Sequence, residues 1–183
     1  MKPDEIEKES FRIILREMGE HPFTPEELVI LQRVIHATAD FEYAQLLRFS
    51  PGAIEAGINA FRNGCELICD VRMIAVGVNR KRLAQLGSQV QCLVDDPQVA
   101  NIALQSNQTR SEVAMRRFGE RLANAVVAIG NAPTALLEVL RLYEVENIRP
   151  ALVVGVPVGF VNAAESKQSL QSTSLNYIST TGR

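Results

Sequence analysis

Two stretches in the second half of the sequence decide the fold: AVVAIGNAPT at residues 125–134 and ALVVGVPVGF at residues 151–160. Each begins with a short apolar run rich in valine and continues into a segment that contains glycine and proline. Short apolar runs bounded by turn residues are typical of strands that are buried on both faces of a sheet. We therefore expect two strands of a parallel sheet here, each followed by a Gly/Pro loop.

Further strands and helices alternate around these two stretches. LICD at residues 67–70 and VQCLV at residues 90–94 have the same short apolar pattern, and helix-like segments cover residues 110–122 and 133–146. Alternation of strands and helices predicts a parallel sheet with helices on both sides. The expected fold class is a three-layer α/β/α, Rossmann-like arrangement with a mainly parallel sheet, in a single domain over residues 1–183.

The first part of the chain has a helical pattern instead. Apolar residues recur at helical spacing over residues 3–18, and Gly19 then ends the helix. A second helix begins at Thr24-Pro25-Glu26-Glu27, where Thr24 can cap the helix and Glu27 completes a capping box, and it continues through His36. We expect two more helices, one capped by Asp40 and reaching about Leu47, the other opened by Ser50-Pro51 and closed by Gly64.

Composition limits the classes of function. The net charge of −2 argues against a nucleic-acid partner. No apolar run reaches membrane-spanning length, and the acidic N-terminus MKPDEIEKES does not resemble a signal peptide. Three cysteines without paired spacing fit reduced thiols, so we expect a cytoplasmic protein. Cys65 and Cys69, even with the two histidines, show no tetrahedral zinc set, and we expect no protein-bound metal.

Three expected strand ends can carry chemistry. In open parallel α/β sheets, ligands bind beyond the carboxyl ends of the strands. Here these ends are Cys69-Asp70, the loop over residues 129–134 and the loop over residues 154–160. Glycine permits close approach of the backbone, and a following helix offers free N–H groups to an anion, so both loops suit a ligand with carboxylates or phosphates. The alternative that they are only tight turns stays open, and neither matches a nucleotide-binding glycine fingerprint.

Charged side chains add candidates. His36 can give or take a proton near neutral pH, and Arg33, three residues earlier, lies on the same helix face. That pair suits an acidic ligand that needs a proton donor, although a purely structural role for both residues stays open. Arg110 is expected at a helix start, where a cation is unfavourable to the helix dipole, which indicates a ligand or a buried partner.

Several motifs together resemble the precorrin-8X methylmutases, called cobalt-precorrin-8 methylmutases in the anaerobic route. The resemblance covers nearly the whole chain, from about Glu9 to Ser169. It rests on these segments: ESFRII (9–14), RVIHA (33–37), LICDVRM (67–73), NQTRS (107–111), VAIGNAPTAL (127–136) and GVPVGFVNAAESK (155–167). The last two segments are long and specific, and they occur in the family's order, so chance does not explain the agreement.

The resemblance implies an isomerase that moves a methyl group from carbon 11 to carbon 12 of a corrin precursor, without a cofactor of its own. It also implies an α/β/α homodimer with a site built partly from both subunits. By this analogy His36 is the proton donor or acceptor, and Ser10, Arg33 and Arg110 bind the substrate. Backbone N–H groups at Gly130, Asn131 and Gly159 are expected to bind further substrate carboxylates.

The sequence departs from the family pattern at residues 178–183, ISTTGR. Family members usually continue there with an Arg-Gly-Arg segment and a final helix, so we expect that helix to be absent from these 183 residues. Two other functions stay open. One is a non-catalytic corrinoid carrier of the same fold, which would bind the corrin acid without isomerising it. The other is a Rossmann-like nucleotide-binding enzyme, which the missing glycine fingerprint disfavours.

Overall fold

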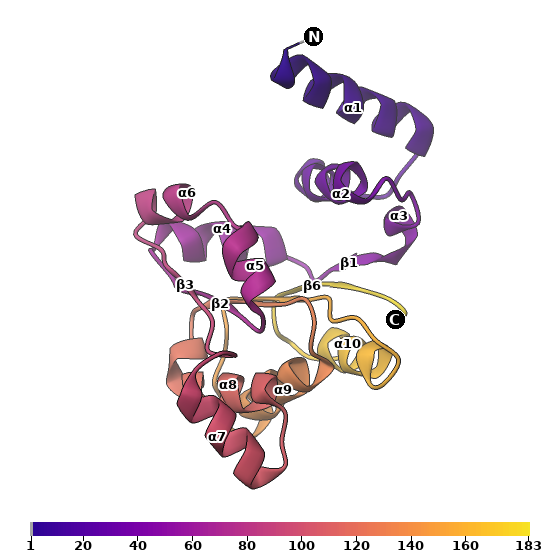
Figure 1. The fold of residues 1–183 in the computed structure, drawn as a ribbon. Coiled ribbons are helices and arrows are strands. Elements are labelled where there is room, and N and C mark those ends of the chain that lie inside the picture. The colour runs from indigo at the N-terminus through magenta and orange to yellow at the C-terminus, as the bar shows by residue number, and fades with distance from the viewer. Residues whose placement is uncertain (1) are drawn as a thin grey trace. The chain divides into compact units, whose positions relative to one another are not determined.

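A computed structural model describes residues 2–183, apart from the side chain of Asp4. The contacts divide the chain into two compact units, one ending at Leu47 and the other comprising Arg48–Arg183. Figure 1 labels the elements, which are α1 (Pro3–Met18), α2 (Pro25–Thr38), α3 (Tyr43–Leu46), β1 (Leu47–Phe49), α4 (Ala53–Arg62), β2 (Leu67–Cys69), α5 (Arg72–Gly77), α6 (Arg80–Gln85), β3 (Val90–Gln91), α7 (Pro97–Ser106), α8 (Arg110–Phe118), the 3₁₀ helix η1 (Gly119–Leu122), β4 (Val126–Ile129), α9 (Pro133–Glu146), β5 (Leu152–Gly155), α10 (Ala163–Gln171) and β6 (Tyr177–Thr180).

The first unit is helical, as the sequence predicts. Thr24 Oγ1 accepts from the Glu27 N–H at 3.3 Å and the Glu27 carboxylate accepts from the Thr24 N–H at 2.9 Å, so the predicted capping box opens α2. Beyond α2 the predicted helix is shortened to the single turn of α3. Asp40 Oδ1 accepts from the Glu42 N–H at 2.8 Å in a tight turn, and Leu47 already belongs to a strand.

The second unit contains the parallel sheet. The described residues form six strands in the order β1-β6-β5-β4-β2-β3. The pairs β2–β3, β2–β4, β4–β5 and β5–β6 are all parallel, with Val127 opposite Ile68 on one side and Val153 on the other. The prediction of a mainly parallel sheet is therefore confirmed. The strand expected over residues 90–94 is only Val90–Gln91, and β6, with its polar residues Ser179 and Thr180, was not predicted.

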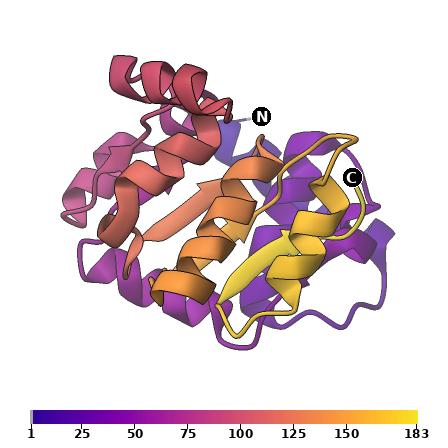
Figure 2. The ribbon, with the colours of Figure 1, turned by 90° about the horizontal axis from the view of Figure 1, so that it is seen from below.

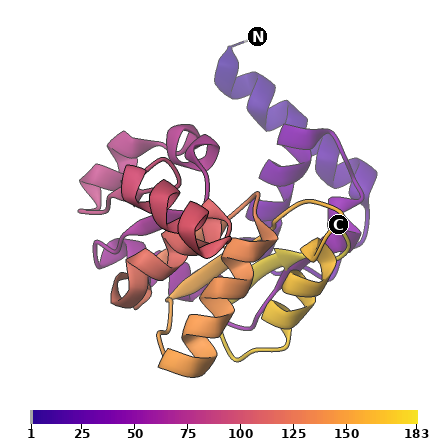
Figure 3. The ribbon, with the colours of Figure 1, turned by 60° about the horizontal axis from the view of Figure 1, so that its bottom comes forward.

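Helices cover both faces of this sheet, which gives the predicted three layers. Helices α4 and α5 pack on one face, and α8, α9 and α10 lie side by side on the other (Figures 1 and 2). Figure 3 shows α9 and α10 running along the strands beneath them. The layers meet closely at Gly155, where a Cβ atom would lie 2.5 Å from Leu170 Cδ2, so a larger residue there would force the Leu170 side chain to move.

One buried carboxylate joins two neighbouring helices of that layer, α8 and α9. Glu138 of α9 is 4% exposed and accepts from Arg116 Nε of α8 at 2.9 Å and from Arg141 Nη2 at 2.8 Å. Burial alone raises the pKa of Glu138, but the hydrogen bonds from Arg141 and Arg116 outweigh burial, and the net pKa lies below its ordinary value of 4.5. The ionised form is therefore favoured in the folded state.

This carboxylate makes stability depend on acidity. The pKa of Glu138 is lower in the folded state than in the unfolded state, so its ionised carboxylate stabilises the fold. This stabilisation is complete above the unfolded-state pKa and is lost as the pH falls through the folded-state pKa. We expect Glu138→Gln to lower the free energy of unfolding by about 3 kcal/mol at pH 7. The difference from the wild type should shrink as the pH falls from about 4.5 through the lower pKa of the folded state, because the wild-type carboxylate is itself protonated at the end of that range.

Urea denaturation followed by circular dichroism at several pH values measures this effect, since the chain has no tryptophan. Glu144→Gln, on the exposed side of the same helix, is the control and should change stability little at any pH. A difference between Glu138→Gln and wild type that stays constant down to pH 3 would contradict this role of the ion pairs.

Candidate active site

The carboxyl ends of β2, β4 and β5 lie at one edge of the sheet, and a buried aspartate organises it. Asp70, directly after β2, is fully buried. One carboxylate oxygen accepts from the Gly130 N–H at 3.0 Å, and the other accepts from the N–H groups of Asn131 at 3.0 Å and Ala132 at 2.7 Å. These bonds hold the turn between β4 and α9. The sequence marked Asp70 as an unusual strand end, but not this role.

The same bonds correct one expectation from the sequence. The N–H groups of Gly130 and Asn131 were expected to bind a substrate carboxylate, but both already donate to Asp70. That expectation is wrong, because an N–H group aimed at a buried anion is not directed at a ligand. The Asn131 side chain itself is exposed and stays a candidate contact. Gly130 packs closely against α5, since a Cβ atom there would lie 2.8 Å from Ile74 Cδ1 and that side chain would have to move.

Gly159 lies in the loop between β5 and α10. Its φ of +141° is a conformation that side-chain-bearing residues rarely adopt, while no atom would crowd a Cβ there. The glycine is therefore required by the path of the backbone. Val156 N–H donates to the Ile129 carbonyl at 2.8 Å, so this loop leaves the sheet beside the turn that Asp70 holds. A ligand role for the Gly159 N–H stays a prediction.

Arg110 is the first residue of α8, as expected from the sequence. Thr109 caps the helix, and its hydroxyl lies 2.7 Å from the hydroxyl of Thr134, so the starts of α8 and α9 are joined at the same edge of the sheet. Arg110 lines a pocket of about 660 Å³ together with Asn101 and Leu104 of α7. Within residues 2–183 its exposed guanidinium has no ion-pair partner, which leaves it available to an anionic ligand.

Three further predicted residues come together in the first unit, where α1 packs against α2. The hydroxyl of Ser10 lies 2.7 Å from Nδ1 of His36, and the Phe11 ring meets the His36 ring edge to face at 5.6 Å. The Ser10 bond occupies Nδ1 and leaves the other ring nitrogen, Nε2, for a ligand. Phe11, which orients the imidazole, belongs to a quoted motif but received no role from the sequence.

Arg33 lies on the other side of the same aromatic ring. Its guanidinium stands 5.5 Å from the centre of the Phe11 ring and its Nη1 lies 3.2 Å from the Glu7 carboxylate. Both charged groups of this ion pair are about half exposed, and such pairs contribute little to stability. A substrate carboxylate can therefore compete with Glu7 for the arginine.

Among the residues that the structure describes, the remaining cysteine and metal-ligating residue types give no further candidate for the site. Burial raises the pKa of the Cys69 thiol to about 12, so it stays protonated and unreactive. In the described part of the chain, no group of three or more His, Cys, Asp or Glu side chains is placed to hold a metal ion. Nor does any helix of that part have the length and apolar character needed to cross a membrane.

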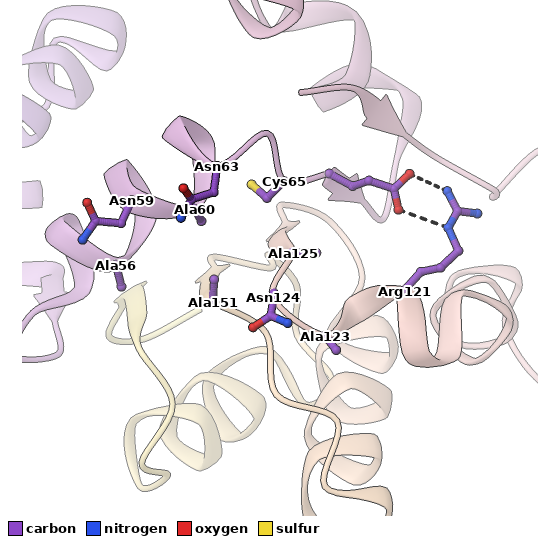
Figure 4. A pocket seen from close by; sticks show the side chains of 11 residues that line it. Ala56, Asn59, Ala60, Asn63, Cys65, Arg121, Ala123, Asn124, Ala125 and Ala151 are labelled. Carbon is purple, nitrogen blue, oxygen red and sulfur yellow. Dashed lines mark hydrogen bonds and ion pairs between the residues drawn. The ribbon is translucent and has the colours of Figure 1, made fainter. Parts of the chain in front are cut away.

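A second pocket, of about 520 Å³, lies at the opposite edge of the sheet (Figure 4). Cys65, Ala125 and Ala151, which precede β2, β4 and β5, line it together with Asn59 and other small or amide side chains. Its one ion pair, Arg121 with Glu66 at 2.6 Å, neutralises itself. None of the predicted site residues reaches this pocket, and it is at the amino ends of the strands, so we place the candidate site elsewhere.

Comparison with known proteins identifies the family of this chain. The family model described as precorrin-8X methylmutase matches residues 5–183. The chain belongs to the precorrin-8X methylmutase family. The cobalt-precorrin-8 methylmutase of Priestia megaterium is 44% identical over 183 residues, which cover 100% of this chain and 81% of that protein. The cobalt-precorrin-8 methylmutase of Leptospira interrogans is 45% identical and covers 97% of this chain and 84% of that protein.

A solved structure of precorrin-8X methylmutase from Thermus thermophilus has the same fold. It superposes with a TM-score of 0.88 at 45% identity and covers 97% of this chain and 87% of that chain. Family membership confirms the resemblance seen in the motifs and makes the chain an isomerase of cobalamin biosynthesis. The non-catalytic carrier finds no support in the names of these relatives.

The hydrogen bonds from Gly130, Asn131 and Ala132 to Asp70 should stabilise the turn between β4 and α9. Asp70→Asn keeps the shape but presents an NH₂ group where an oxygen accepted N–H bonds, so at least one donor loses its partner. We expect the free energy of unfolding to fall by about 2 kcal/mol. Amide hydrogen exchange at Gly130, Asn131 and Ala132 should accelerate, because their protection depends on Asp70.

Asp95→Asn serves as the matched control, since Asp95 is exposed and pairs only with Arg72. Its effect should stay below about 1 kcal/mol. Equal exchange rates in Asp70→Asn and wild type would show that the turn holds its shape without the carboxylate.

Proposed function

We propose that this chain moves a methyl group from carbon 11 to carbon 12 of precorrin-8X or cobalt-precorrin-8, giving hydrogenobyrinic or cobyrinic acid. The observation that carries the proposal is the Ser10–His36 pair at 2.7 Å, in a member of the precorrin-8X methylmutase family. Incubation with both substrates, followed by the change in visible absorption, tests the reaction and distinguishes the metal-free substrate from the cobalt form.

The reaction is an intramolecular rearrangement. The bond from the methyl group to carbon 11 breaks while the bond to carbon 12 forms, so neither an external methyl donor nor a redox cofactor takes part. His36 helps by protonating, or donating a hydrogen bond to, a ring nitrogen or adjacent carbon of the macrocycle, and the proton is returned afterwards. Such general-acid help is typically worth about 10²–10⁴-fold in rate.

Ser10 acts through His36 in this proposal. If the serine hydroxyl donates to Nδ1, the neutral imidazole carries its hydrogen on Nε2 and presents it as a donor. The bond also fixes the plane of the ring, together with the edge-to-face contact from Phe11. We also propose that the same hydroxyl of Ser10 contacts the substrate directly.

Substrate carboxylates are bound by Arg33 and Arg110, with Asn131 and Gly159 as further contacts. Arginine and carboxylate form charge-assisted hydrogen bonds, which are stronger than neutral ones. We also propose that the enzyme is a cytoplasmic homodimer and that any cobalt belongs to the substrate rather than to the protein.

The sharpest prediction concerns His36. His36→Ala should reduce turnover by about 10²–10⁴-fold, because proton transfer contributes mainly in the transition state. Affinity for the product should change much less, since binding comes chiefly from other residues. Single-turnover kinetics and a titration with hydrogenobyrinic acid measure the two effects separately.

His21→Ala is the control, because His21 lies outside the Ser10–His36 pair. Ser10→Ala should lower turnover about tenfold, as expected for the loss of one hydrogen bond, and Ser10→Thr should recover most of it by keeping a hydroxyl. Wild-type turnover in His36→Ala would refute the mechanism, while the family assignment would stand.

Arg110 allows a test of substrate binding that does not disturb the fold. Arg110→Ala should weaken binding of hydrogenobyrinic acid by about tenfold to a hundredfold and make it less sensitive to salt. Stability should stay the same or rise slightly, since a cation at a helix start is unfavourable. Arg117→Ala, at the other end of α8, is the control, and equal affinities of the Arg110 and Arg117 variants would remove this role.

A further inference from the structure

The loop between β5 and α10 presents large apolar side chains to solvent. Val158, Phe160 and Val161 are 59%, 86% and 76% exposed. A single exposed apolar residue is ordinary, but three within four residues are a local concentration of apolar side chains, which is typical of a contact site. Packing within this unit does not explain them, because their side chains are not used to fill its core.

The backbone of this loop is held in uncommon conformations. Gly159 has a φ of +141° and Asn162, which precedes α10, has a φ of +61°. Backbone held in sparsely populated regions is concentrated at ligand-binding and catalytic sites. The path of this loop therefore depends on Gly159 and Asn162, which lie on either side of the exposed Phe160 and Val161.

The loop shares its edge of the sheet with the other candidate contacts of the same unit. The bond from Val156 N–H to the Ile129 carbonyl places the start of the loop beside the turn that carries exposed Asn131. From that turn, the contact between the Thr134 and Thr109 hydroxyls leads to Arg110 at the start of α8. Exposed apolar side chains and the Arg110 cation, which has no ion-pair partner among the described residues, therefore lie along one edge.

We propose that residues 158–161 are the apolar seat for one face of the corrin macrocycle, with the Phe160 ring as the central contact. This inference rests on the proposed function. The substrate is flat and apolar across its face and carries carboxylates at its periphery. The loop complements this pattern, because the Arg183 guanidinium lies over the Phe160 ring, 5.2 Å from its centre, and supplies a cation for a carboxylate at the periphery.

The test measures binding of hydrogenobyrinic acid to Phe160→Ala by absorption titration. We expect an affinity about tenfold weaker, as for the loss of one large aromatic contact, and an intermediate loss for Phe160→Leu. The thermal midpoint should not change, because the side chain is almost fully exposed. Val145→Ala is the matched control: Val145 is 72% exposed, near the end of α9 that is remote from Arg110 and Thr134, and its replacement should not affect binding.

Different outcomes separate this inference from the function on which it rests. Wild-type affinity in Phe160→Ala, with an active wild-type enzyme, overturns the inference and leaves the function standing. Wild-type affinity combined with a lower mass by light scattering also overturns it, and assigns the loop to a contact between subunits. If the wild type binds the corrin acid without isomerising its precursor, the proposed function fails, while weaker binding by Phe160→Ala still supports the seat.

Discussion

The arrangement of the carboxyl edge depends on one buried anion. Asp70 has lost all contact with water, and three backbone N–H groups of the β4–α9 turn compensate for that loss. Because β2 and β4 are neighbours, the side chain bridges two strand ends and sets the direction in which α9 leaves the sheet. Thr134, in the first turn of α9, then meets Thr109 at the start of α8, so the position of Arg110 follows from the same constraint.

This constraint also determines how the edge can recognise a ligand. In many α/β proteins, the free N–H groups of a Gly-rich turn bind the anion directly. Here the protein's own carboxylate takes that place, so recognition of a carboxylate-bearing ligand moves to side chains such as Arg110 and Asn131. Side chains on an open edge can contact groups spread around a large ligand, whereas a turn of three N–H groups can enclose only one small anion.

Much of the fold was predictable because its signals are local. The valine-rich runs before Gly130 and Gly155 identify β4 and β5, and Thr24 with Glu27 fixes the start of α2. Strand β6 was missed because Ser179 and Thr180 interrupt the apolar pattern. The Ser179 hydroxyl can be buried because it donates to the Gly155 carbonyl, a partner that only the folded chain supplies. The role of Asp70 was missed for the same reason, since its donors lie about 60 residues away in the sequence.

Shifted pKa values in this protein mark structure rather than chemistry. Burial lowers the pKa of Lys167, whose Nζ donates to the Thr180 hydroxyl, and raises that of Cys69, while Arg141 and Arg116 lower that of Glu138. All three side chains are buried, where a large ligand has no access. His36 and Arg110 are exposed instead. A substrate as large as a macrocycle can contact only side chains that are open to solvent, and these two residues meet that condition while the three buried groups do not.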